Sequence, residues 1–187
     1  MSFRFNPERL AYFETAGWRA YYDRKWLKML RLIAAMSQEE FHIPFPMSLV
    51  AAYYTMRASM AWVPVEHDER KVYTYLEKFY RVARRYSGLK FDLARVAQLE
   101  LRYFKVHRRL VDVEDKSEFV QTLVELHSAL FGLSEEQVRE SAELRVEAAT
   151  VVDRITGKKS SDIEGDWVLL EKYLRQCYSS IQQALDS

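Results

Sequence analysis

Residues that break regular structure are scarce in this 187-residue chain, which holds only 5 glycines and 4 prolines. Between them run long stretches whose apolar residues recur at the spacing of an amphipathic helix. Few breakers and long periodic runs favour a helical domain over a β-sandwich or barrel. The sequence therefore predicts an all-α fold. We expect a single domain over residues 1–187, because this length suits one core and no linker interrupts it.

Capping residues and breakers place about seven helices along the chain. The first begins at Asn6-Pro7-Glu8 and runs to about residue 36, with a kink or change of neighbours near residues 22–25, where its apolar face moves. The other six are expected over approximately 46–62, 68–87, 92–111, 116–132, 134–157 and 162–185. The second helix carries one charge, Arg57, and is apolar around its circumference, which is typical of a buried helix. We therefore predict a multi-helix bundle wrapped around residues 46–62.

Composition excludes several classes of protein. Apolar residues make up 49% and charged residues 29% of the chain, which excludes a disordered protein. The single cysteine, Cys177, excludes an intramolecular disulfide and a cysteine-rich metal site. The first residues lack the apolar stretch of a signal peptide, and no charge-free run reaches the length of a membrane span. We expect a cytoplasmic protein without a membrane partner.

Charge is unevenly spread along the chain. Residues 1–110 hold 20 basic and 11 acidic residues, a net charge of +9, whereas residues 111–187 hold 8 and 16, a net charge of −8. The simplest interpretation is attraction between the two halves, within one domain or across a homodimer. The alternative is a basic face for an anionic partner. A pI near 7.8 does not favour nucleic acid as that partner.

Ionisable residues occupy positions that the helical pattern reserves for apolar side chains: Glu14, Arg57, Glu100, His107, His127 and Arg145. Burying an unpaired ion costs several kcal/mol, so these groups are expected to meet partners in the interior. The register of the predicted hairpin between 92–111 and 116–132 sets Glu100 level with His127, which predicts a contact between them. Tyr54 and Tyr103 lie on the same helices and either satisfy these groups or line a pocket with them.

Our leading hypothesis is a cavity among these helices for a small anionic or aromatic ligand. In it, Arg57 and Arg145 would bind the anion, while Glu100 and His127 would orient the ligand or exchange a proton with it. The complete set of candidate ligand-binding residues is Arg57, Glu100, His127, Arg145, Glu14, Tyr54 and Tyr103.

Two alternatives belong to other classes of function. The first is a metal-dependent or acid–base enzyme that uses Glu100 and His127. The sequence does not hold the two Glu-x-x-His pairs that a four-helix di-iron site needs, and core arginines repel a cation, so we assign no metal ligand and no cofactor. The second alternative is an interaction or dimerisation module without a small ligand.

Overall fold

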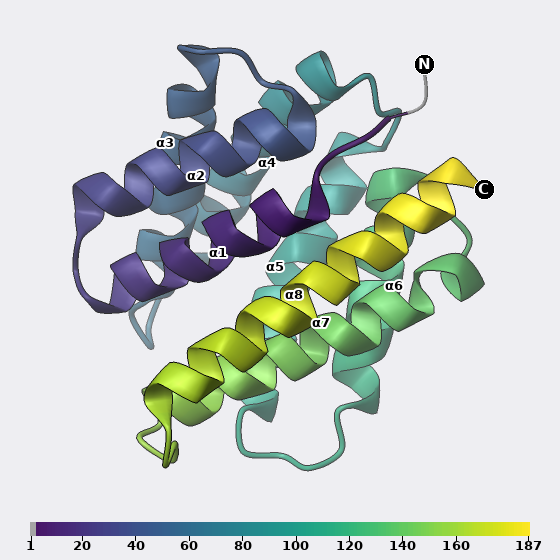
Figure 1. Ribbon diagram of the computed structural model, residues 1–187. Helices are drawn as coiled ribbons and strands as arrows, with labels where there is room; N and C mark the ends of the chain where they lie inside the picture. The colour runs from purple at the N-terminus through teal and green to yellow at the C-terminus, as the bar shows by residue number, and fades with distance from the viewer. Residues whose placement is uncertain (1–2) are drawn as a thin grey trace.

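The structure is a computed structural model that describes residues 3–187. Within that range the chain forms eight α-helices and no strand (Figure 1). In chain order the helices are α1 (Pro7–Tyr22), α2 (Trp26–Phe41), α3 (Met47–Trp62), α4 (Glu69–Ser87), α5 (Leu93–Leu110), α6 (Ser117–Phe131), α7 (Glu135–Thr156) and α8 (Ile163–Asp186). The prediction of an all-α fold is confirmed.

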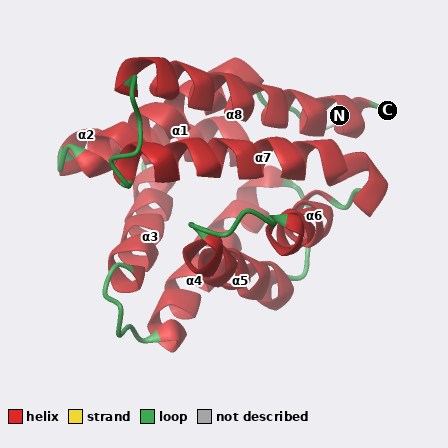
Figure 2. Ribbon diagram, turned by 90° about the horizontal axis from the view of Figure 1, so that it is seen from below, coloured by secondary structure: helices red, strands yellow, loops and turns green. Residues whose placement is uncertain are grey.

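The helices form a closed circuit. Each one packs against the next along the chain, and α8 returns to pack against α1. Figure 2 shows α1, α2, α7 and α8 in one half of the molecule and α3 to α6 in the other. In such an arrangement no helix of the described chain occupies the middle of the molecule, and side chains from the surrounding helices point into it.

The predicted helix starts and stops are largely confirmed, because capping groups act where the sequence places them. The side chain of Asn6 accepts a hydrogen bond from the backbone of Arg9 at 2.9 Å and so opens α1. Ser134 and Gln137 form a reciprocal capping box at the start of α7. Gly88 ends α4 with a φ of 75°, in the left-handed region.

The first predicted helix is two helices. The kink expected near residues 22–25 is a full reversal, in which Arg24 has a φ of 57° and separates α1 from α2. The two helices run antiparallel, since Arg9 near the start of α1 forms an ion pair with Glu39 near the end of α2 at 2.9 Å. In addition, α2 continues to Phe41, beyond the predicted end near residue 36.

The prediction of a central helix over residues 46–62 is not supported. The corresponding α3 takes its place in the circuit, where it packs against α2 and α4. Its buried residues are small: Ser48, Ala51, Ala52 and Ala58. Its larger apolar side chains include exposed ones, with Tyr53 at 47% and Met60 at 55% of their surface. The sequence is apolar on all sides, but the fully buried positions of α3 hold small residues, while large ones such as Tyr53 and Met60 are exposed.

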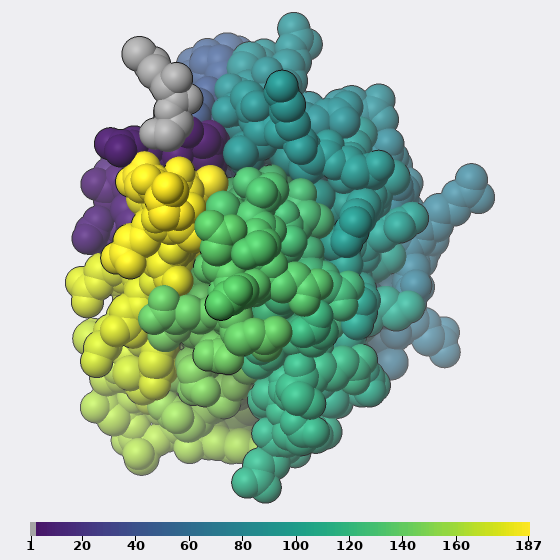
Figure 3. Space-filling model, turned by 90° about the vertical axis from the view of Figure 1, so that its right-hand side faces the viewer, coloured from purple at the N-terminus to yellow at the C-terminus, as the bar shows by residue number. Residues whose placement is uncertain are grey.

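The two ends of the described chain lie side by side. Arg4 forms an ion pair with Asp186 at 3.0 Å, and the backbone N–H of Phe5 donates to Gln182 at 2.9 Å. In Figure 3 the purple N-terminal segment accordingly lies against the yellow end of α8. None of the eight helices combines the length and hydrophobicity that crossing a membrane requires.

Candidate functional site: a central cavity

A cavity of about 640 Å³ lies inside the circuit, and all eight helices contribute residues to its wall. Most of the wall is apolar or aromatic, with Trp18, Phe79 and Leu123 as examples. The polar part of the wall includes the carboxylates of Glu14, Glu40 and Glu100, together with Arg145 and His127. An apolar chamber with few polar groups is the usual form of a small-molecule site.

Glu14 and Arg145 form a buried ion pair across the wall. Nη1 of Arg145 lies 2.6 Å from one carboxylate oxygen of Glu14, and Nη2 lies 2.5 Å from the other. The hydroxyl of Tyr178 donates a further hydrogen bond to Glu14 at 2.6 Å, and the guanidinium lies 5.4 Å from the ring centre of Trp18. Burial lowers the pKa of Arg145, but the Glu14 carboxylate outweighs burial and raises that pKa well above its usual value. The guanidinium of Arg145 is therefore charged, and it is directed at the Glu14 carboxylate.

Two further carboxyl groups in the cavity have no cation bound to them. Burial, together with the negative charges of Glu14 and Glu100, raises the pKa of Glu40 to about 8 against the attraction of Arg145. Burial raises the pKa of Glu100 to about 7, although Arg145 and a hydrogen bond from Tyr80 at 3.1 Å lower it. Near neutral pH both groups are only partly ionised, because the wall supplies too little positive charge.

His127 has a defined tautomer. Its Nδ1 lies 2.8 Å from the hydroxyl oxygen of Ser141, and that hydroxyl donates its single hydrogen to the carbonyl oxygen of Val138, also at 2.8 Å. The Ser141 oxygen must then accept from His127, so Nδ1 carries the proton and Nε2 has a free lone pair. Burial and the nearby Arg145 lower the pKa of His127 to about 3, which keeps the imidazole neutral.

The cavity opens where the ends of α1, α3, α5 and α7 meet. The wall residues Tyr22, Val63 and Val111 are exposed there. Arg108 closes one side of this opening: its guanidinium lies 4.0 Å from the ring centre of Trp62 and donates to the Trp62 carbonyl at 2.5 Å. These contacts fix the end of α3 to the end of α5.

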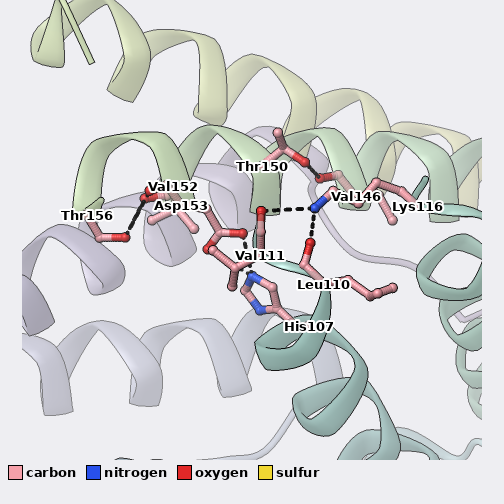
Figure 4. Close-up of polar contacts among 9 residues, drawn as sticks. All are labelled: His107, Leu110, Val111, Lys116, Val146, Thr150, Val152, Asp153 and Thr156. Atoms are coloured by element: carbon pink, nitrogen blue, oxygen red, sulfur yellow. Dashed lines mark hydrogen bonds and ion pairs between the residues drawn. The ribbon is translucent and has the colours of Figure 1, made fainter. Parts of the chain in front are cut away.

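A second polar pair strengthens the same region (Figure 4). Nε2 of His107, on α5, lies 3.0 Å from both carboxylate oxygens of Asp153, on α7. The imidazole stacks on the ring of Phe119 with 5.1 Å between centres. Nearby, the Lys116 ammonium donates to the carbonyl oxygens of Leu110 and Val111 at the end of α5. The prediction that His107 finds a partner at a partly buried position is confirmed.

The structure brings together most of the predicted site residues, and the five that line the cavity are Glu14, Glu100, Tyr103, His127 and Arg145. Arg57 and Tyr54 do not line it. Arg57 lies instead among tyrosines on the outer side of α3, with Nη1 3.2 Å from the hydroxyl of Tyr53 and the guanidinium 5.2 Å from the ring centre of Tyr75. Only one of the two arginines expected to bind an anion is therefore at the cavity.

The predicted contact between Glu100 and His127 is replaced by separate pairs, Glu100 with Tyr80 and His127 with Ser141. The sequence analysis also missed Glu40, whose position carried a signal. Met29, Ile33 and Ser37 of α2 line the cavity, and Glu40 follows at helical spacing. Extending the helix beyond residue 36 would have placed Glu40 on the same face.

The chemistry available at this wall is that of binding and proton exchange. Within residues 3–187 no three His, Cys, Asp or Glu side chains are grouped as a metal site would require. Burial raises the pKa of the Cys177 thiol to about 12, so the thiolate that a nucleophile needs is not formed near neutral pH.

Comparison with known proteins does not add a family to this description. No family model matches the chain, and neither the curated proteins nor the solved structures gave a match.

Proposed function

We propose that this protein binds a small, largely apolar molecule in its central cavity. The observation that carries the proposal is the cavity of about 640 Å³, which falls within the roughly 300–1,000 Å³ of small-molecule sites. Its apolar and aromatic wall supports a ligand with an apolar body, in agreement with the aromatic ligand that the sequence suggests. Its few polar groups supply orientation.

Gly17 supports the view that the cavity is maintained for use. It lies in the middle of α1 and lines the cavity, and a Cβ atom built on it would meet no atom within 4 Å. Glycine within a helix costs about 0.5–1 kcal/mol relative to alanine. A larger residue would fit the backbone here and would fill the chamber. Glycine at this position therefore keeps the cavity open at a small cost in helix stability.

The proposal is tested with Nile red, a neutral apolar dye whose fluorescence rises in apolar surroundings. Titration of the purified protein is expected to give a saturable rise with one dye per chain. Gly17→Phe, which places a ring in the cavity, is expected to weaken dye binding about tenfold or more, whereas the matched variant Gly17→Ala retains it. Dye binding that is absent, or equal in both variants, would contradict the proposal.

A second candidate function is acid–base catalysis on the bound molecule, which the pKa of about 7 at Glu100 favours. A general acid or base works best when its pKa lies near the working pH. Small molecules extracted from the purified protein would be incubated with fresh protein and analysed by mass spectrometry. A new product that Glu100→Gln no longer forms would support catalysis, and unchanged recovery would support binding alone.

A further inference from the structure

Several hydrogen-bond donors at the cavity already have acceptors within the protein. Both terminal nitrogens of Arg145 are bonded to Glu14, and the hydroxyl of Tyr178 donates to the same carboxylate. The hydroxyl of Tyr80 donates to Glu100. An anion that pairs with the Arg145 guanidinium would have to displace the Glu14 carboxylate or share that guanidinium with it.

The acceptors, in contrast, are free. His127 lines the cavity at 8% exposure, and its Nε2 receives no hydrogen bond from any described residue. Glu40 forms neither a hydrogen bond nor an ion pair within residues 3–187. Glu100 accepts only the one bond from Tyr80. Acceptors that no protein group occupies are available to a donor carried by a ligand.

Charge leads to the same requirement. Glu14 is ion-paired with Arg145, Asp153 shares hydrogen bonds with His107, and Arg108 at the opening donates to the backbone carbonyls of Pro64 and Trp62. Glu40 and Glu100 are then the carboxylates without a bound cation, and the chamber is acidic when they ionise. Aromatic wall residues such as Trp18, Tyr80 and Tyr103 add ring faces, which attract cations.

We infer that the cavity selects a protonated amine carried on an apolar body, whose N–H groups bond to free acceptors of the wall, chiefly the carboxylates of Glu40 and Glu100. This inference rests on the proposed binding function and assigns the chemical class of its ligand. It replaces the anion expected from the sequence with a cation, because Arg57 lies outside the cavity and Arg145 is neutralised by Glu14.

Three probes that share one apolar body test the inference on the wild-type protein: phenylbutylamine, phenylbutanol and phenylbutanoate, which are cationic, neutral and anionic near neutral pH. Their affinities are measured by calorimetry and by displacement of Nile red. The amine is expected to bind at least about tenfold more tightly than the alcohol, the gain from a charge-assisted hydrogen bond, and the carboxylate more weakly than either.

Variants assign the effect to the two glutamates. Glu40→Gln and Glu100→Gln are each expected to weaken amine binding about fivefold or more and to change alcohol binding less than about twofold. The matched control is Glu147→Gln, an exposed glutamate of α7, which should leave both affinities unchanged. Circular dichroism checks that each variant is folded.

The outcomes separate this inference from the proposed function. If Nile red binds but the alcohol or the carboxylate binds as tightly as the amine, the inference is overturned and the binding function stands. The same holds if both glutamine variants retain full amine affinity, or if none of the three probes displaces the dye. If neither the dye nor any probe binds, both are overturned.

Discussion

Glu14 of α1 and Arg145 of α7 are separated by 131 positions in the chain, yet their side chains meet end to end through two hydrogen bonds. Glu14 is 5% exposed, so water does little to weaken this attraction. The pair links the two halves of the chain across the cavity wall. It also holds the buried guanidinium of Arg145 against a carboxylate.

Breaking this ion pair is expected to destabilise the protein strongly. Arg145→Met leaves the Glu14 carboxylate buried without a counter-ion, and we expect a loss of about 3–5 kcal/mol in the free energy of unfolding. Denaturation by urea measures the loss. The double variant Glu14→Gln/Arg145→Met should recover a large part of it, because no buried charge remains. A loss below about 1 kcal/mol for the single variant would contradict the buried pair.

Stability is expected to fall as the pH is raised from about 6.5 to 8. The pKa values of Glu40 and Glu100 lie at about 8 and about 7, above those of unfolded glutamate, so the folded state binds more protons across this window. Stability therefore decreases with pH, by about 2 kcal/mol for the two groups together. The charged and titratable groups that share the wall with them are Glu14, Tyr80, Tyr103, His127, Arg145, Cys177 and Tyr178.

The glutamine variants identify the source of this pH dependence. Urea denaturation of Glu40→Gln and Glu100→Gln at several pH values should give flatter profiles than the wild type, with equal or greater stability at pH 8. Glu100→Ala, which we would expect to be costly if Glu100 held a buried cation, should lose little at pH 8, because its partner is the Tyr80 hydroxyl. A flat profile over this window would contradict the raised pKa values, because acids ionised in both the folded and the unfolded state contribute no pH dependence.

His127 is expected to stay neutral, with its proton on Nδ1, as the pH is lowered from 8 to 5. Its pKa lies at about 3, and the Ser141 hydroxyl accepts the Nδ1 proton. Nitrogen chemical shifts of the imidazole, measured by NMR, distinguish the two tautomers and the protonated ring. Ser141→Ala removes the acceptor and should allow the other tautomer to appear. A protonated His127 at pH 6 would contradict this assignment.

Two glycines should respond to alanine in opposite directions. Gly17→Ala is expected to stabilise the protein by about 0.5–1 kcal/mol, since α1 gains a better helix former and the added Cβ meets open space. Gly88→Ala should destabilise it, because Gly88 ends α4 with a φ of 75° that an L-residue adopts only with strain. Thermal unfolding measures both, and a loss of stability in Gly17→Ala would place its Cβ in a packed region.

The helix ends were predictable because short-range capping decides them. Asn6 and the Ser134–Gln137 box act within a few residues, so the sequence alone carries the information. The stripe positions of Glu14 and Arg145 were also readable from helical spacing. Which partner each would meet was not, because that depends on how distant helices come together.

The errors come from tertiary packing. The apolar face of the predicted first helix changes near residues 22–25, which indicates that the helix is interrupted there. Whether the chain kinks or reverses depends on Arg24, which adopts a left-handed conformation. In α3 the apolar residues surround the helix, and the pattern cannot tell that alanines face the neighbours while Met60 faces outward. Glu40 was missed because the end of α2 was placed too early.

Because α8 packs against α1, the cavity is complete only after the last helix of the chain has folded onto the first. The wall cannot be assembled stepwise from neighbouring pairs alone, because its last seam joins helices from opposite ends of the sequence. Contacts of such long separation form slowly, after local ones. While the chain is being synthesised, helices α1 to α7 can pair as they emerge, but the chamber acquires Tyr178 and its final side only when α8 arrives.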